Sequence, residues 1–316
     1  MHEGPKLPSW ASEGRAASGA SLREAHRTGL LARRAREAGT LLERCDLCPR
    51  ACGVDRCAGE RGACGAGAIA EVASAGPHFG EEPPLVGRLG SGTTFFAHCG
   101  LRCLFCQNHD ISFGSGQPVG AEGLAAIMLH LQREGCHNVN LVTPTHYLPQ
   151  ILAAVDVAAA GGLEIPLVWN CGGYESVAAL ALLDGIVDIY MPDFKFAEPG
   201  PARRLCGAPD YFDVARAAVR EMHRQVGDLE LGPDGTARRG LLVRHLVLPG
   251  GEAGTERVVA FLADEVSRET WVNVMDQYRP CHRAREFPPL DRRITGGEYE
   301  AARAAARRAG LHRGIL

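Results

Sequence analysis

Short runs of β-branched and aromatic residues alternate with longer amphipathic stretches over most of the chain. Strand-like composition occurs in six runs: Thr93–Phe96, Asn138–Val142, Leu167–Trp169, Ile186–Tyr190, Leu241–Val247 and Trp271–Met275. Apolar residues three or four positions apart predict helices between them, over Gly120–Glu134, Tyr147–Ala160, Ser176–Leu183, Tyr211–Gln225 and Thr255–Ser267. This alternation predicts a parallel sheet with right-handed crossovers. Six such units predict an α/β fold, either a doubly wound sheet or a partial (βα)6 barrel of the TIM type.

The first 90 residues have a different composition. Residues 1–20 are rich in Gly, Ser, Ala and Pro and predict a loose tail, and residues 21–44 predict one helix that opens at Ser21. Residues 45–67 hold five cysteines and five glycines, too little apolar material for a core, so metal would have to hold them together. A Pro/Gly-rich connector follows over 77–92. We expect three parts: 1–44 (tail and helix), 45–90 (Cys-rich module and connector) and 91–316 (barrel with a C-terminal extension).

Composition narrows the possible functions. The 34 basic and 37 acidic residues give a net charge of −3, which disfavours nucleic-acid or anionic-membrane binding. The longest clean apolar run, Val177–Leu183, is far shorter than the ~20 residues of a membrane-spanning helix. The twelve cysteines cluster as metal ligands do in reducing compartments, and the first 44 residues lack a hydrophobic signal core. We therefore expect a cytoplasmic protein that does not enter a membrane.

Three cysteines, Cys99, Cys103 and Cys106, follow the first predicted strand with the spacing Cys-x3-Cys-x2-Cys. Gly100 permits a positive φ, and soft thiolates select iron–sulfur clusters or zinc. Structural zinc sites and electron-transfer clusters usually take four protein ligands, whereas the next cysteine here is Cys136. Three thiolates on a four-iron cluster leave one iron open to a small molecule. The spacing therefore favours an enzyme over an electron carrier.

This spacing, with an aromatic residue before the third cysteine and six βα units behind it, resembles the radical S-adenosylmethionine superfamily. Within it, residues 45–275 resemble the pyruvate formate-lyase activating enzyme homologues. The resemblance implies a partial barrel, a 4Fe-4S cluster on the three cysteines, and S-adenosylmethionine on its open iron. It also implies an oxidoreductase that forms a 5′-deoxyadenosyl radical and takes hydrogen from a peptide or protein. The implied partners are a glycyl radical enzyme or other peptide and a flavodoxin- or ferredoxin-type electron donor.

The segments after the second and third strands carry expected cofactor contacts. Activating enzymes have Gly-Gly-Glu after the second strand to hold the methionine amino group, whereas this chain has Thr143-Pro144-Thr145-His146. The resemblance therefore assigns that role to Thr143, Thr145, His146 and free carbonyls, with a structural histidine as the alternative. Asn170-Cys171-Gly172-Gly173-Tyr174 resembles the family's Asp-Thr-Asn-Gly-aromatic segment and implies that Asn170 and Gly172 contact the cofactor.

The fourth and fifth strands carry charged candidates. Met191-Pro192-Asp193-Phe194-Lys195 resembles Met-Leu-Asp-Leu-Lys of the family, which implies that Asp193 and Lys195 lie beside the cofactor. Arg244, in an apolar strand that resembles Arg-x-x-x-x-Pro-Gly, costs several kcal/mol unless paired. The cofactor carboxylate would satisfy it, and so would a buried salt bridge to Asp193 or Glu175. Residues 276–282 are expected to line the mouth of the site and contact substrate.

A second set of thiols lies in the N-terminal module. Four of them form the expected ligand set for zinc or an auxiliary four-iron cluster, and the spacing does not decide between the two metals: Cys45, Cys48, Cys52 and Cys64. Cys57 is expected to be a bystander, and Cys136, Cys171 and Cys206 to be buried core thiols.

Two other classes of function remain open. One is a non-enzymatic iron–sulfur or zinc protein for electron transfer or protein interaction, in which every metal is fully ligated. The other is a zinc-ribbon nucleic-acid binder, which would need a basic face and aromatic platforms. The charge of −3 and the 6% aromatic residues make the second the weaker of the two.

Overall fold

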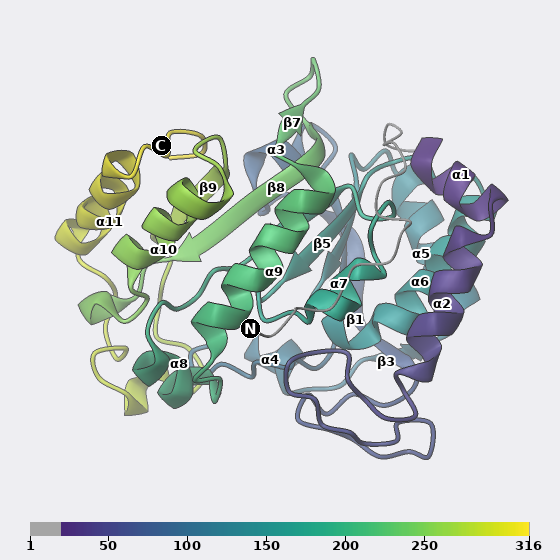
Figure 1. Cartoon of the computed structure of the whole chain (residues 1–316), viewed down its shortest axis with the longest axis horizontal. Helices are drawn as coiled ribbons and strands as arrows, with labels where there is room; N and C mark the ends of the chain where they lie inside the picture. The colour runs from purple at the N-terminus through teal and green to yellow at the C-terminus, as the bar shows by residue number, and fades with distance from the viewer. Residues whose placement is uncertain (1–19, 316) are drawn as a thin grey trace, which may run out of the picture.

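The computed structural model describes residues 20–315, which form a mixed α/β fold around a nine-stranded sheet (Figure 1). The tail expected over 1–20 lies outside the described residues except for residue 20, and the capping side chain of Ser21 also lies outside the description. The strand order is β3-β1-β2-β4-β5-β6-β8, with β7 and β9 both beside β8.

Six of the described strands pair in parallel, and their order in the sheet follows their order along the chain, as the strand–helix alternation predicts. They are β2 (Ser91–Phe96), β4 (Val139–Val142), β5 (Leu167–Cys171), β6 (Ile189–Pro192), β8 (Ala237–Leu246) and β9 (Trp271–Met275). The predicted start of the fourth strand at Ile186 is wrong. The N–H groups of Ile186 and Val187 donate to the carbonyl of Leu183, so these residues close the preceding helix.

Sequence patterning missed three short or irregular strands. β1 (Ala70–His78) pairs antiparallel with β2, β3 (Gln117–Val119) pairs antiparallel with β1, and β7 (Glu230–Leu231) pairs antiparallel with β8. β1 carries small residues, a Gly and a Pro in place of strong apolar alternation. In the sequence the end of β1 therefore resembles a connector. The connector expected over 77–92 in fact includes the last two residues of β1 and the first two of β2.

The five helices predicted between strands are confirmed: α5 (Ala121–Arg133), α6 (Leu148–Ala160), α7 (Val177–Ala181), α9 (Tyr211–Val226) and α10 (Thr255–Phe261), which continues as a π-helical turn over Leu262–Val266. The single N-terminal helix is in fact two, α1 (Ala20–Arg27) and α2 (Leu30–Thr40), because Gly29 has a φ of 70° between them. Unpredicted helices are α3 (Pro83–Val86), α4 (His109–Ser112), α8 (Pro199–Cys206) and α11 (Gly296–Arg308), with 3-10 turns at Thr145–Tyr147, Pro249–Gly251 and Ala284–Glu286.

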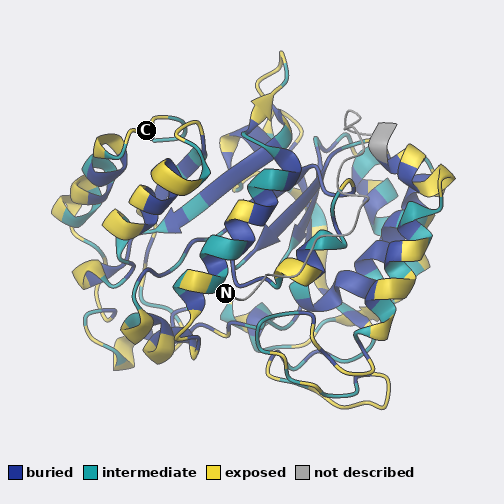
Figure 2. Ribbon diagram, in the orientation of Figure 1, coloured by how far each residue is buried: buried dark blue, intermediate teal, exposed yellow. Residues whose placement is uncertain are grey.

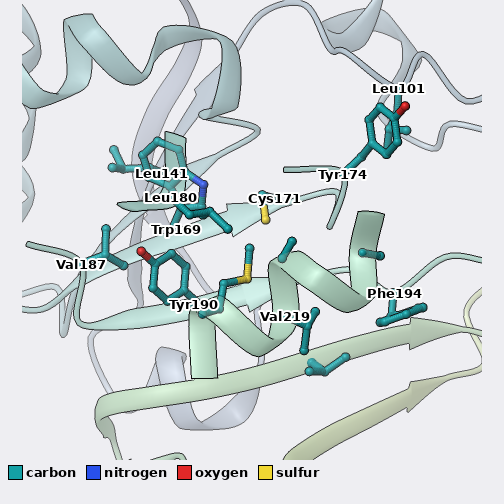
Figure 3. Close-up of a cluster of buried hydrophobic side chains, with 14 of the residues drawn as sticks. Leu101, Leu141, Trp169, Cys171, Tyr174, Leu180, Val187, Tyr190, Phe194 and Val219 are labelled. Carbon is teal, nitrogen blue, oxygen red and sulfur yellow. The ribbon is translucent and has the colours of Figure 1, made fainter. Parts of the chain in front are cut away.

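The parallel strands are buried on both faces, and their side chains alternate between two cores (Figure 2). Trp169 and Tyr190 belong to the larger core, which also contains Val219 of α9 (Figure 3). Val168 and Ile189 belong to a smaller core with Leu85 of α3. The α3 face of the sheet is therefore distinct from the face covered by α9, and each strand-end side chain is assigned to one of them by its position in the alternation.

The Cys-rich module adds its few apolar side chains to the larger core. Leu47, Cys45, Cys64 and Ala66 are buried in that core together with residues of the sheet and helices. In Figure 1 the module forms the purple loops below α2. None of the helices within residues 20–315 combines the length and apolar character needed to cross a bilayer.

Candidate functional site

The three predicted ligands Cys99, Cys103 and Cys106 lie on one loop between the carboxyl end of β2 and α4. Two backbone hydrogen bonds anchor this loop: Leu104 donates to the Leu205 carbonyl at 2.8 Å and accepts from the Arg283 N–H at 2.9 Å. Cys103 is buried, and burial raises the pKa of Cys99 to about 11. The same cause raises the pKa of Cys106. Metal binding here would release protons, because metals bind the thiolate form.

A fourth thiol lies at this loop, and the sequence did not reveal it. Cys206, expected to be an ordinary core thiol, ends α8 and forms a hydrogen bond with Cys103. That hydrogen bond raises the pKa of Cys103 and lowers the pKa of Cys206. Cys206 is buried in the larger core, as expected. The two residues are about a hundred positions apart, so local spacing carried no signal.

Charged side chains from three neighbouring strands meet next to this loop. Asp193 accepts from Lys195 Nζ at 2.6 Å and from Arg244 Nε at 2.7 Å. Arg244 also donates to Asn170 Oδ1 at 2.9 Å, and its Nη1 lies 3.5 Å from Glu81. The structure thus brings together Asn170, Asp193, Lys195 and Arg244, and the buried salt bridge is to Asp193 rather than Glu175.

The electrostatics of this ion network are strongly coupled. Burial alone would raise the pKa of Asp193, but the cations of Arg244 and Lys195 outweigh it and hold that pKa below its usual value. Burial opposes the charge on Lys195, but Asp193 and the nearby Cys103 sulfur keep the pKa of that ammonium above its usual value. Lys195 therefore stays charged beside Cys103 and Cys106.

Two glycines and a tyrosine hold the network against the cysteine loop. A Cβ on Gly172 would stand 2.6 Å from the side chain of Leu101, so the absence of a side chain lets the loop pack directly on the end of β5. Gly173, with a φ of 75°, likewise approaches the Asp193 carbonyl. Tyr211 accepts from the Lys195 N–H at 2.9 Å, and its hydroxyl lies 2.7 Å from the Asp193 carbonyl oxygen. Tyr211 escaped sequence analysis because its only signal was a helical position.

Two more carboxylates reach the network from the segment before α3. Glu82 is buried, and both of its carboxylate oxygens accept from the Asn273 amide nitrogen, at 2.8 and 2.9 Å. Burial raises the pKa of Glu82. Glu81 is the partner of Arg244 described above. Sequence analysis treated this segment as a connector and found neither residue.

Thr145 and His146 do not join the network. Thr145 donates to Glu175 at 2.6 Å, and Glu175 also contacts Trp169 and Cys171, which lie on the larger-core face of β5. The His146 Nε2 lies 2.8 Å from the Ala97 carbonyl, and burial lowers the pKa of His146 to about 3. Thr143, with a φ of 58°, donates its N–H to the Asn170 carbonyl.

The segment after β9 lies on the cysteine loop. Gln107 donates to the Gln277 carbonyl at 3.2 Å. The His282 ring packs on Phe113 and His109, with centroid separations of 4.5 and 5.3 Å. Residues 277–283 therefore border the loop, and substrate contact by residues 276–282 stays a prediction.

The second thiol set lies partly inside the fold. Cys45 and Cys64 are buried, whereas Cys48 and Cys52 are only partly buried. Burial is the main reason that the pKa of Cys48 rises to about 12. Cys57 is exposed. Within residues 20–315, no three His, Cys, Asp or Glu side chains are arranged around one point as the ligands of a single metal ion would be.

The fold and site define an α/β protein with a thiol-rich loop and a partly buried ion network at the ends of its parallel strands. The uncharacterized protein MJ0674 of Methanocaldococcus jannaschii is 34% identical to this chain over 278 residues, which cover 84% of this chain and 75% of that protein. The chain therefore belongs to the same family as MJ0674. No family model matches it.

Proposed function

We propose that this chain is a radical S-adenosylmethionine enzyme whose six parallel strands form a partial (βα)6 barrel. The observation that carries the proposal is the convergence of a three-cysteine loop with the partly buried side chains of Lys195, Asp193 and Arg244. In an electron-transfer site with four thiolates, such a network of cations and carboxylates beside the metal has no evident task. An amino-acid ligand, which carries both an ammonium and a carboxylate, would use one.

In this proposal Cys99, Cys103 and Cys106 hold a 4Fe-4S cluster that also binds S-adenosylmethionine. When bound, this pair supplies the chemistry: one electron splits a sulfonium C–S bond into methionine and a 5′-deoxyadenosyl radical, which takes a hydrogen atom from the substrate. The chain's residues bind and orient the groups. The Lys195 ammonium offsets the negative charge of thiolates at Cys103 and Cys106, which stabilises the deprotonated ligands.

The remaining polar groups suit the methionine end of the cofactor. Arg244 and Asn170 offer donors to a carboxylate, with Arg244 exchanging part of its contact with Asp193. Asp193 and Glu81 offer acceptors to an ammonium. These carboxylates take the place of the family's missing Gly-Gly-Glu, because the Thr145 hydroxyl and His146 ring are already engaged elsewhere. Gly172 and Thr143 contribute backbone groups at the same strand ends.

The proposed substrate is a peptide or protein, as in the activation of a glycyl radical enzyme, with residues 277–283 beside the reacting site. The proposed reductant is a flavodoxin- or ferredoxin-type protein. A reducing compartment such as the cytoplasm would keep the thiols free for iron.

The test is anaerobic reconstitution with iron and sulfide, reduction, and measurement of 5′-deoxyadenosine by mass spectrometry. We expect formation by the wild type and none by Cys103→Ala. A fully reduced four-iron protein that binds S-adenosylmethionine and yet leaves it intact with every peptide offered would contradict the proposal.

A second candidate is an electron-transfer protein, and the proximity of Cys206 to Cys103 favours it, because this thiol adds a further soft donor beside the loop. Mössbauer spectra of the wild type and Cys206→Ala separate the two functions. The enzyme has one distinct iron already in the wild type, and Cys206→Ala leaves its spectrum and its iron content unchanged. The electron carrier has four equivalent ligand sites, and Cys206→Ala creates the distinct iron.

A further inference from the structure

A groove of about 360 Å³ opens beside the Cys99–Cys106 loop. Three segments that are far apart in the sequence line it: the 45–67 module, this loop, and the carboxyl end of α8. Its apolar lining includes Leu101 and Leu104 of the loop and Leu205 of α8. Because Leu104 lies between Cys103 and Cys106 in the sequence, the groove gives a partner direct access to the part of the loop that carries these two thiols.

The polar lining of this groove is basic. Its charged members are Arg50, Arg102, Arg203 and Arg204, and the lining contains no acidic side chain within residues 20–315. Glu252, which does not line the groove, forms an ion pair with Arg204. The whole chain has a net charge of −3, so the groove is a local departure from the charge of the rest of the molecule. Such a patch attracts an acidic surface and raises the rate at which it arrives.

Two of these guanidinium groups have contacts that fix their position and leave their charge unbalanced. Arg50 donates to the Gly100 carbonyl of the loop at 3.0 Å and to two carbonyls at the end of α8 at 2.5 and 2.6 Å. The Arg102 guanidinium lies 4.6 Å from the ring centroid of Phe113. Carbonyls and aromatic rings are neutral partners, so both arginines keep a full positive charge at the groove.

Arg203 has no such commitment. Its side chain is exposed in the last turn of α8 and has no hydrogen bond, ion pair or ring contact with any other residue of 20–315. A cation in the last turn of a helix is favourable on its own, because it offsets the helix dipole. Arg133 meets that need in the last turn of α5 and lines no such groove. Arg203 differs by standing among three other guanidinium groups.

The spread of these charges favours a broad acidic surface over a small anion. A bound phosphate would need several donors aimed at one point, whereas the N–H groups of Arg50 already bond carbonyls and Arg102 stacks on a ring. A protein face with several carboxylates can meet charges on three segments at once. Complexes between redox proteins are weak and bury little surface, so a groove of this size suffices for one.

We propose that this groove docks the acidic face of the protein electron donor, of the flavodoxin or ferredoxin type, against the Cys99–Cys106 loop. The docking follows from charge and shape, and the task of the docked protein rests on the function proposed above. In that task the reduced cofactor of the donor loses one electron, and the cluster held by the loop gains it.

The binding experiment uses the full chain after anaerobic reconstitution, with oxidised flavodoxin and oxidised ferredoxin as separate probes in calorimetry. We expect Arg203→Glu to weaken binding of the donor by about fivefold or more at low ionic strength, because it reverses a charge that faces the partner. Arg133→Glu makes the same change in the last turn of another helix and should leave binding unchanged. Equal affinity of the wild type and Arg203→Glu, or binding of neither probe by the wild type, would overturn the inference.

Two further measurements keep the result independent of one variant. Wild-type binding should weaken steeply as salt is added, and Arg203→Gln should bind with an affinity between those of the wild type and Arg203→Glu. Polyglutamate should compete with the donor, whereas inorganic phosphate at the same ionic strength should not. Competition by phosphate alone would show a site for small anions and would contradict the docking surface.

The rate of 5′-deoxyadenosine formation tests what the docked protein does. With the protein donor as the sole reductant, Arg203→Glu should be slower by about fivefold or more at low donor concentration. With dithionite, which needs no docking, both proteins should react at the same rate. Equal slowing with both reductants would refute the docking role. A wild type that is inactive with either reductant would contradict the proposed function, and the binding measurements would still decide the groove.

Discussion

The two cysteine-rich regions of this protein place similar ligands in opposite surroundings. The Cys99–Cys106 loop has three thiols beside a partly buried network of Lys195, Asp193 and Arg244. In the 45–67 module, backbone N–H groups donate to the sulfurs of Cys52 and Cys64, and the Arg50 guanidinium is committed to carbonyls. The first setting places charged side chains beside the thiols, whereas the second places backbone donors there.

This difference teaches that cysteine spacing alone does not separate a reactive centre from a structural one. What separates them is the set of charged side chains that lies beside the thiols. The ion network comes from β5, β6 and β8, far from the loop in sequence, while the module builds its environment from its own backbone. The predictions below test the contrast, beginning with the largest expected effect.

Replacing Cys103 by Ala should abolish iron binding at the loop. The reason is that the proposed cluster then keeps only two of its three thiolate ligands. Iron content per chain is the measurement. Cys136→Ala, which removes another buried thiol, is the matched control and should keep all iron. Iron content of Cys103→Ala equal to that of the wild type would contradict the assignment.

Replacing Arg244 by Ala should lower the free energy of unfolding by about 3 kcal/mol, because it leaves Asp193 buried without one of its two cations. The same change should weaken S-adenosylmethionine binding without removing the cluster. Urea unfolding and calorimetry measure the two effects. Unchanged affinity with reduced stability would make Arg244 purely structural, as in the alternative of a buried salt bridge.

Replacing Arg50 by Met should cost about 2 kcal/mol, since three carbonyls of the neighbouring segments lose a charged donor. The loss should be visible in the unfolding free energy of the metal-loaded protein. Arg61→Met, a change to an exposed arginine of the same module whose guanidinium bonds only the Gly65 carbonyl and Glu71, provides the comparison and should cost much less. Equal costs would mean that Arg50 does not join the two regions.

The smallest expected effect is on the pH dependence of the free energy of unfolding, to which one buried carboxyl contributes. Asp188, which precedes β6 and accepts the Leu167 N–H at 2.9 Å, has a pKa raised by burial from 3.8 to about 7. A carboxyl whose folded pKa is raised stabilises the fold fully below pH 3.8, and that contribution is lost as the pH rises through 7. The free energy of unfolding of the wild type should therefore decline between pH 5 and 7, and in Asp188→Asn this decline should be smaller by about 1 to 2 kcal/mol. An identical pH profile for both proteins in urea unfolding would contradict the assignment.

Much of the architecture could be predicted from local sequence patterns. The six parallel strands follow from alternating strand-like and helical runs, because period and composition reflect burial on the two faces of a sheet. The strand-end positions of Asn170, Asp193 and Lys195 follow from the same reading, since side chains after parallel strands meet at one edge. Strand β1 and the break at Gly29 were not predicted, because small residues and one positive φ leave little periodic signal.

Local sequence patterns therefore predicted both cysteine sets and the polar residues at the strand ends. Local patterns did not predict the partners of these groups, because the partners depend on packing between distant segments. Cys206 contacts Cys103, Glu81 reaches Arg244, and Arg50 joins the two thiol regions. Thr145 and His146 are engaged elsewhere. Local spacing reports which side chains share a face of one element. Which distant group satisfies a buried charge or thiol is set by how the elements pack, and that is a property of the folded chain.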